Sequence, residues 1–301
     1  MAGSLRAYAD LLRLHFFFAW PLLFCSGYLL ATTAYGGFAW LVLAKVALIG
    51  FFGFEAGLVL NDYIDRDIDR VVVEPDRLTK YWRLSGTRPI PAGLVPPVHA
   101  LALFLLFAGI AAVLILTLPP PHSVYVLLLM AYCYVMEIFY QKEKQIPQTF
   151  PFPQLLGRTD FAIFPVAGYL CAGFPDTTAL LYFLFFYPFA IAHLGVNDLI
   201  DEESDRLRGL RTIPTIYDAG RTRIWIAGFT AIHAMMAVLF LTRLTLIGRA
   251  GVYAGMVLLI IANFMILRYK TPDAGVKALP LFHVAMALYT TGICAGALLA
   301  V

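Results

Sequence analysis

The stretch "NDYIDRDIDR", residues 61–70, follows a long apolar run and places four aspartates and one asparagine within ten positions. A second stretch, "NDLIDEESDR" at residues 197–206, repeats this pattern after another apolar run. When the two stretches are aligned, one asparagine and three aspartates coincide, namely Asn61, Asp62, Asp65 and Asp69 with Asn197, Asp198, Asp201 and Asp205. Such a weak internal repeat is typical of a membrane protein built from a duplicated helical unit.

The composition of the chain is that of an integral membrane protein. Hydrophobic residues make up 61% of its 301 residues and charged residues 14%, whereas soluble domains average roughly 45–50% and about 25%. Apolar runs of about 20 residues, long enough to cross ~30 Å of hydrocarbon, recur along the whole length. We therefore expect an all-α membrane protein, with a single integral-membrane domain over residues 1–301 and nine transmembrane helices near residues 14–34, 39–60, 98–118, 122–140, 159–174, 178–197, 224–242, 250–267 and 279–300.

The distribution of basic residues predicts how the chain is oriented in the membrane. Nineteen of the 22 lysines and arginines fall at the N-terminus or in the alternate connections that would lie on the same side, and only Arg243 and Arg249 fall in the others. Because basic loops remain in the cytoplasm, we expect a cytoplasmic N-terminus and an outer C-terminus, with both acidic stretches facing the cytoplasm. The net charge of +3 gives no indication of a nucleic-acid partner.

The spacing of the acidic residues predicts a magnesium site. If each helix continues through its motif, steps of four place Asn61, Asp65 and Asp69 on one face, and the second motif repeats this arrangement. Carboxylates crowded in this way repel one another unless they are protonated or gain a cation. Oxygen ligands of this kind suit Mg²⁺, which takes one or two carboxylates together with water and phosphate oxygens. An EF-hand is excluded, because Arg70 stands where that loop needs glycine.

Ordinary solvation is the alternative explanation of these acids. A charged helix end beside a membrane surface is common, and it would account for one motif alone. Two motifs of matching spacing on the same side favour a functional pair. Asp67, Glu202 and Glu203 lie off the shared face, and we interpret them as ordinary solvated charges without a metal-binding role.

At these residues the sequence resembles the UbiA superfamily of intramembrane prenyltransferases. That family carries N-D-x-x-D-x-x-x-D after its second helix and D-x-x-x-D after its sixth, within a bundle of nine transmembrane helices. The first pattern matches from Asn61 to Asp69, and the second matches at Asp201 and Asp205, with Asp198 as an additional acid. The resemblance implies Mg²⁺-dependent transfer of an isoprenyl chain from its diphosphate, through an allylic carbocation, to an aromatic quinone precursor or a lipid acceptor.

Three shorter segments extend the resemblance. "RPIPAG" at residues 88–93 and "GLRT" at residues 209–212 resemble the basic segments that follow the family's two motifs, and "YQKEK" at residues 140–144 resembles its Tyr-x-x-x-Lys element. The sequence departs from the family by inserting "LTKYWRLSGTR", residues 78–88, before the R-P-I element. Either Arg77 or Arg88 could therefore reach phosphate. We favour Arg88 because Pro89 follows it.

These observations assign a role to each candidate residue. We expect catalytic work and metal binding from Asp65, Asp69, Asp201 and Asp205, with Asn61, Asp62 and Asp198 as further metal ligands. The candidates for diphosphate binding are Arg77, Arg88, Lys142, Lys144, Arg208 and Arg211. Tyr140 and Asn197 are expected to line the acceptor or prenyl pocket.

A cation-coupled transporter is the main rival function. It would use paired intramembrane carboxylates, and it predicts acids near the middle of the membrane in broken helices. Both acidic stretches instead lie at one expected boundary, beside basic loops suited to an anionic substrate. The six histidines show no spacing typical of metal ligands, and His193, four residues before Asn197, is expected to be a structural residue bonded within the bundle.

Overall fold

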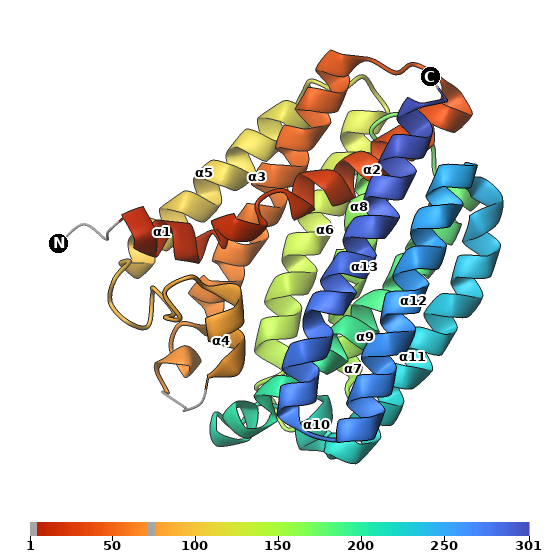
Figure 1. Ribbon diagram of the computed structural model, residues 1–301. Helices are drawn as coiled ribbons and strands as arrows, with labels where there is room; N and C mark the ends of the chain where they lie inside the picture. The colour runs from red at the N-terminus through yellow and green to blue at the C-terminus, as the bar shows by residue number, and fades with distance from the viewer. Residues whose placement is uncertain (1–4, 72–75, 301) are drawn as a thin grey trace.

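The computed structural model describes residues 5–71 and 76–300, and within these ranges every regular element is a helix (Figure 1). Eight helical segments are long and apolar enough to cross a membrane. They are η1 with α2 (Leu14–Phe16 and Ala19–Tyr35), α3 (Trp40–Asp65), α5 (Pro97–Leu116), α6 (His122–Glu143), α9 (Thr177–Leu207), α11 with η3 (Ala219–Phe240 and Leu241–Arg243), α12 (Leu246–Tyr269) and α13 (Pro272–Leu298).

These segments lie where eight of the nine expected spans were placed. The fifth expected span, residues 159–174, contains α8 (Thr159–Tyr169), which has 11 residues and an internal proline, Pro165. At roughly 1.5 Å per residue, α8 is about 16 Å long, or half the thickness of the hydrocarbon core. A six-residue helix, α7 (Phe152–Gly157), precedes it. The described residues therefore contain eight long apolar helices and one short buried helix, and the count of nine spans stays a prediction.

Four short elements complete the structure, which are α1 (Leu5–Leu11), η2 (Ile68–Arg70), α4 (Arg77–Trp82) and α10 (Ile213–Ile216). Both α4 and α10 lie at the end of the bundle opposite the C-terminus (Figure 1). The first turn of α4 is fixed by Asp76, whose carboxylate accepts a hydrogen bond from the Thr79 amide at 2.9 Å, as is usual at a helix N-cap. Helix α4 belongs to the inserted segment that follows the first acidic motif.

The two acidic motifs differ in their backbone. The expectation of a continuous helix is confirmed for the second motif, because α9 runs to Leu207. It is wrong for the first motif, where α3 ends at Asp65 and a tighter 3₁₀ turn, η2, carries Asp69. A 3₁₀ turn has fewer residues per turn than an α-helix, so Asp69 is rotated away from the face that an unbroken α3 would give it.

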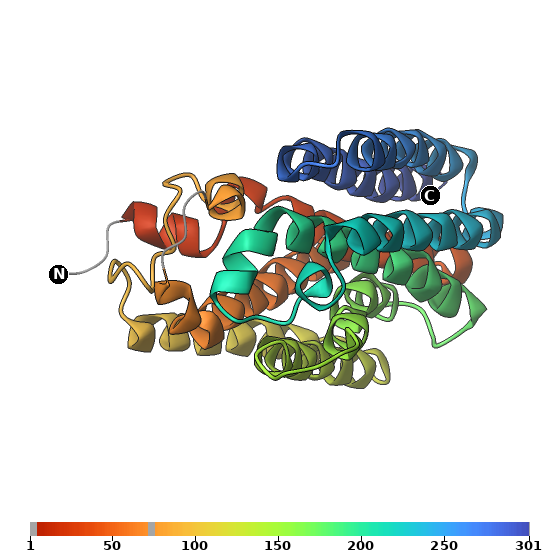
Figure 2. The ribbon, with the colours of Figure 1, turned by 90° about the horizontal axis from the view of Figure 1, so that it is seen from below.

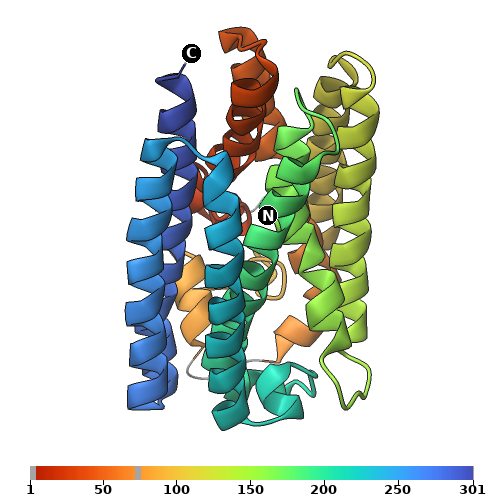
Figure 3. The ribbon, with the colours of Figure 1, turned by 90° about the vertical axis from the view of Figure 1, so that its right-hand side faces the viewer.

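The long helices run side by side and pack mainly in pairs (Figures 2 and 3). Helix α12 packs along α13, α11 along α9, and α3 along α5, while α2 lies among α3, α8 and α13. Helices α2 and α8 approach each other closely at Gly27 and Gly168. A Cβ atom on Gly168 would lie 1.9 Å from the Phe24 carbonyl oxygen. The absence of a side chain at Gly168 therefore permits the close packing of α2 against α8.

This contact predicts that Gly168→Ala destabilises the protein. The added methyl group would meet backbone that cannot move independently, and overpacking of this kind costs about 1–3 kcal/mol. The midpoint of thermal unfolding in detergent should fall by several degrees. Gly57→Ala is the matched control, because nothing lies within 4 Å of a Cβ at that position. Equal midpoints for the two variants would contradict this account of the α2–α8 contact.

Candidate active site

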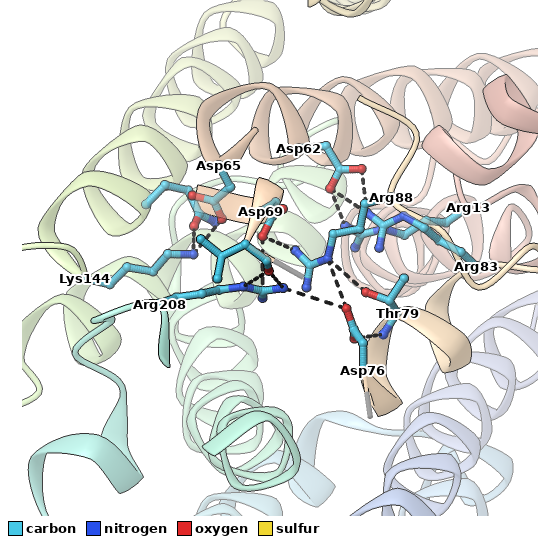
Figure 4. Close-up of polar contacts among 12 residues, drawn as sticks. Arg13, Asp62, Asp65, Asp69, Asp76, Thr79, Arg83, Arg88, Lys144 and Arg208 are labelled. Carbon is cyan, nitrogen blue, oxygen red and sulfur yellow. Dashed lines mark hydrogen bonds and ion pairs between the residues drawn. The ribbon is translucent and has the colours of Figure 1, made fainter. Parts of the chain in front are cut away.

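Both acidic motifs line one polar cavity between the ends of α3 and α9. Figure 4 shows the aspartates of the first motif with their basic partners. The cavity has a volume of about 190 Å³. Its walls include all seven residues expected as metal ligands, which are Asn61, Asp62, Asp65, Asp69, Asp198, Asp201 and Asp205. The structure therefore brings together two stretches that lie far apart in the sequence. We call this space the acidic cavity.

Asp62 is held by two arginines from different parts of the chain. Arg83, from the inserted segment, places Nη2 2.7 and 2.6 Å from the two carboxylate oxygens of Asp62. Arg13, which precedes η1, places Nη2 3.1 Å from Oδ1. The carboxylate is buried among these guanidinium groups and is held firmly. Asp62 therefore ties the N-terminal region and the inserted segment to the end of α3.

The other two carboxylates of the first motif are also paired with cations. Lys144 Nζ lies 2.7 Å from Asp65 Oδ2, and Asp69 pairs with both Arg88 and Arg208. Burial lowers the pKa of Lys144, but the carboxylates around it, Asp65 first among them, raise that pKa by more, so that the net shift is upward. Lys144 consequently remains protonated at neutral pH, and the basic side chains balance the charge that the motif brings together.

The carboxylates of the second motif face the same cavity with fewer partners. Among the described residues, the basic side chains that line the cavity pair with first-motif aspartates or with Asp76, Glu137 and Asp160, and none pairs with Asp198, Asp201 or Asp205. Asp198 accepts a hydrogen bond from the Ile213 amide at 3.2 Å. Three carboxylates within two turns of one helix, two of them buried and Asp201 half-buried, disfavour full ionisation of the group unless a cation joins them. The second motif is therefore the part of the cavity with the greatest deficit of positive charge.

The residues of the acidic cavity fit a magnesium ion that also binds water and phosphate. Within residues 5–71 and 76–300, no three His, Cys, Asp or Glu side chains converge closely enough to hold an ion by themselves. Mg²⁺ rarely requires this, because it commonly takes one or two carboxylates and fills its other positions with water and phosphate oxygens. Asp65 Oδ1 is buried and accepts no hydrogen bond. Such an orphaned oxygen, on a residue that lines the same cavity as the α9 carboxylates, is a chemically suitable ligand.

Most of the predicted substrate-binding residues lie at the acidic cavity. Arg88, Lys144, Arg208, Tyr140 and Asn197 line it. Arg77 does not line the cavity and pairs instead with Asp273 at 3.2 Å. Two further candidates do not line the cavity, which are Lys142, an exposed residue, and Arg211, whose backbone amide donates to the Lys144 carbonyl at 2.7 Å.

Several residues of the cavity were not predicted from the sequence. Arg13, Arg83 and Arg158 also line it, although in the sequence all three indicated only the orientation of the chain in the membrane. The signal that could have singled out Arg83 is its place in the inserted segment. No comparable pattern in the sequence distinguishes Arg13 or Arg158 from other basic residues near helix ends.

His193 is bonded within the bundle, as expected. Its Nε2 lies 2.9 Å from Nε2 of His283, and His283 Nδ1 lies 2.7 Å from the Tyr81 hydroxyl on α4. Asn197 lies 3.5 Å from the other ring nitrogen of His193. This chain of polar contacts connects α9, α13 and the inserted segment beside the acidic cavity.

Comparison with known proteins gives several matches. A sequence model of the UbiA prenyltransferase family matches residues 18–291. The chain is 29% identical over 212 residues to a 4-hydroxybenzoate octaprenyltransferase of Aeromonas hydrophila, which covers 69% of this chain and 66% of the relative. It is 30% identical over 206 residues to a digeranylgeranylglyceryl phosphate synthase of Natronomonas pharaonis, which covers 67% and 64%. The matched part thus spans just under two thirds of the length of these curated relatives.

The fold also matches a solved structure over nearly its full length. A UbiA homologue from Archaeoglobus fulgidus, bound to DMAPP and Mg²⁺, has a TM-score of 0.69 and covers 96% of this chain and 99% of that chain. The sequence identity is 14%. At this identity the likeness establishes the fold.

The two-arginine contact predicts that Asp62→Ala destabilises the protein strongly. Removing the carboxylate leaves the buried Arg83 and Arg13 guanidinium groups without their partner, and breaking a buried ion pair costs about 3–5 kcal/mol. Thermal unfolding of purified protein in detergent measures the effect. Asp67→Ala is the control and should change little, because the Asp67 side chain is 63% exposed. A midpoint for Asp62→Ala equal to that of the control would show that the contact does not hold these segments together.

Proposed function

The chain belongs to the UbiA prenyltransferase family, and we propose that it transfers an isoprenyl chain from its diphosphate to an aromatic quinone precursor or a lipid acceptor. The observation that carries this proposal is the acidic cavity, where two aspartate motifs face each other beside Lys144, Arg88 and Arg208. Diphosphate is densely negative, so carboxylates bind it only through bridging cations. A cavity that combines free carboxylates with lysine and arginine provides both kinds of contact.

We assign the metal-binding role chiefly to Asp65, Asp69, Asp201 and Asp205. When bound, Mg²⁺ would neutralise the diphosphate as it leaves, and stabilising charge that develops in the transition state is the main catalytic contribution available here. Asn61 and Asp198 line the same cavity and remain candidates for further metal ligands. Asp62 receives a different role from the one expected, because its two arginines hold it as a positioning residue.

The basic residues bind and orient the diphosphate. Arg88 and Arg208 both approach Asp69, so an incoming diphosphate would meet two guanidinium groups and Lys144 around the first motif. Arginine suits this role because its planar fork makes paired hydrogen bonds to phosphate oxygens. Each of these cations has a carboxylate partner in the present structure, and diphosphate would exchange those contacts for its own.

The isoprenyl tail would lie in a neighbouring apolar cavity. This cavity, about 210 Å³ in volume, lies where η1, α2, α4 and α13 meet, and Trp82 lines both it and the acidic cavity. Phe16, Trp20 and Met286 contribute to its apolar wall. An allylic carbocation formed at the boundary of these spaces needs protection from water, and aromatic faces such as that of Tyr140 stabilise cations.

The orientation of the chain in the membrane forms part of the proposal. We place the N-terminus and the acidic cavity on the cytoplasmic side and the C-terminus on the outer side, because the basic residues gather near the cavity. This orientation requires an odd number of crossings, so α7 and α8 together with the following residues make the fifth of nine. Cation transport would need carboxylates near the middle of the membrane, whereas these motifs lie at the ends of α3 and α9.

Donor binding that depends on the metal is the first expected outcome. Geranylgeranyl diphosphate should bind purified protein in the presence of Mg²⁺, and removing the ion with EDTA should abolish binding. Asp65→Ala and Asp201→Ala should each weaken binding at least about a hundred-fold, because a metal contact to phosphate is worth several kcal/mol. Asp67→Ala, at an exposed position of the same motif, should bind as the wild type does. Unchanged binding in both cavity variants would refute the assignment of the two motifs.

Arg88, the last residue of the inserted segment, and Arg77, which precedes the segment, give a second test. Arg88→Ala should weaken binding of geranylgeranyl diphosphate in Mg²⁺ by roughly ten-fold or more, because a hydrogen bond between charged groups contributes about 1.5–3 kcal/mol. Arg77→Ala should leave the dissociation constant within about two-fold, since Arg77 pairs with Asp273 outside the cavity. Equal losses in the two variants would contradict the assignment of Arg88.

A further inference from the structure

A second cavity joins the acidic cavity and contains charged groups that donor binding does not use. It has a volume of about 140 Å³ and lies among α3, α6 and α8. Arg13, Asn61 and Arg158 line both spaces, so the two cavities adjoin. Phe54, Phe161 and Phe164 form its apolar wall, while Glu137 and Asp160 supply carboxylates. We call it the Glu137 cavity.

Glu137 gathers the hydrogen-bond donors around this space. The Asn61 amide donates to Glu137 Oε1 at 2.7 Å, and the Gln141 amide donates to the same oxygen. Arg158 Nη2 lies 3.5 Å from the other oxygen of Glu137 and 3.8 Å from Asp160 Oδ2. One guanidinium group therefore serves two carboxylates.

The other donors of the wall are engaged as well. The Tyr134 hydroxyl donates to the Gly53 carbonyl at 3.1 Å, and the Cys133 thiol lies 3.5 Å from the Asp160 carbonyl. Arg13 is directed to Asp62. Nε of Arg158 has no hydrogen-bond partner, but it is buried and presents no surface to a ligand. The Tyr134, Cys133 and Arg13 donors are therefore directed to other groups, and Glu137 and Asp160 are the carboxylate acceptors that line the cavity.

We propose that the Glu137 cavity binds the acceptor of the prenyl group, and that it selects a neutral hydroxyl-bearing head group over one that carries a carboxylate. The inference rests on the proposed function. It follows from position, because Asn61 lies one helical turn before Asp65 and separates the cavity from the expected site of bond cleavage. It also follows from charge, because a carboxylate would meet Glu137 and Asp160, which already share the Arg158 guanidinium group, whereas a hydroxyl group can donate to them.

The chemistry of the transfer agrees with this lining. The allylic C–O bond of the donor breaks and diphosphate leaves with the electron pair, while the acceptor atom forms a bond to the allylic carbon. The acceptor then loses one proton, which a neighbouring carboxylate can accept. Glu137 and Asp160 are the carboxylates that line the cavity. The apolar cavity at α4 and α13 leaves this space free of the isoprenyl tail.

The test compares two probes of the same shape and different charge, 4-hydroxybenzamide and 4-hydroxybenzoate. Their dissociation constants are measured by equilibrium dialysis with full-length purified protein, Mg²⁺ and geranyl thiodiphosphate, a donor analogue that reacts slowly. The amide should bind roughly ten-fold or more tightly than the carboxylate, because the carboxylate would be buried without a partner. Glu137→Gln should reduce this preference to about three-fold or less, since it removes one of the two negative charges.

Glu143→Gln is the matched control, because Glu143 lies on the same helix, α6, and does not line the cavity. It should retain the full preference for the amide. Asp160→Asn offers a second cavity variant. Even if both cavity variants unfold, the dissociation constants of the two probes for the wild type test whether the cavity prefers the neutral head group. Equal or tighter binding of the carboxylate by the wild type, or binding of neither probe, would overturn the inference. So would an unchanged preference in a folded Glu137→Gln protein.

Donor binding measured in the same samples distinguishes failure of the proposed prenyl transfer from failure of the acceptor assignment. Loss of the donor analogue in the presence of Mg²⁺ would refute the proposed function, and the acceptor assignment with it. Normal binding of the analogue together with a preference for the carboxylate would refute the acceptor assignment alone.

Discussion

The structure depends on the balance between crowded carboxylates and the basic side chains that reach them. The first acidic motif places Asp62, Asp65 and Asp69 at the end of a membrane helix, where each is buried. Charges in such a place are costly unless they are paired. Their partners come from widely separated segments, which are the N-terminal region, the inserted segment, the end of α6 and the loop after α9. These ion pairs therefore also organise the fold at this end.

The same ion pairs hold the inserted segment, including α4, beside the acidic cavity. Arg83 reaches Asp62 and Arg88 reaches Asp69, while Asp76 caps α4 between them. Tyr81 on α4 contacts His283 of α13. The segment consequently forms one wall of both the acidic cavity and the apolar cavity. In the proposed function, this segment provides a cation for the diphosphate and an aromatic wall for the isoprenyl tail, so it influences both donor binding and tail placement.

Much of this arrangement could be predicted from the sequence, because its main features repeat or have a fixed period. The long apolar runs gave the positions of eight membrane helices, and the matching spacing of Asn61 to Asp69 and Asn197 to Asp205 indicated that the two motifs act together. The short α8 was harder to predict, since its 11 residues are followed by further apolar residues that extend the hydropathy signal. Helix periodicity gave no signal for the end of α3 at Asp65, after which a 3₁₀ turn carries Asp69.

The contributions of Arg13, Arg83 and Arg158 could not be predicted for a related reason. In sequence these residues follow the pattern of ordinary cytoplasmic charge, and only the fold shows that their side chains point inward. Glu137 and Asp160 lie within apolar helices, where a single acid in a sequence gives no indication of its neighbours. Folding brings Glu137 and Asp160 together at the cavity between α3, α6 and α8.

The most direct test of this account is the number of metal ions that the donor brings into the acidic cavity. Mn²⁺ can replace Mg²⁺ at oxygen-rich sites, and its electron paramagnetic resonance signal distinguishes bound from free ion. The account predicts that geranylgeranyl diphosphate causes the protein to bind about two Mn²⁺ ions per chain, one for each motif. Uptake that is the same without the donor, or no uptake with it, would contradict the claim that a metal-bridged diphosphate joins the two motifs.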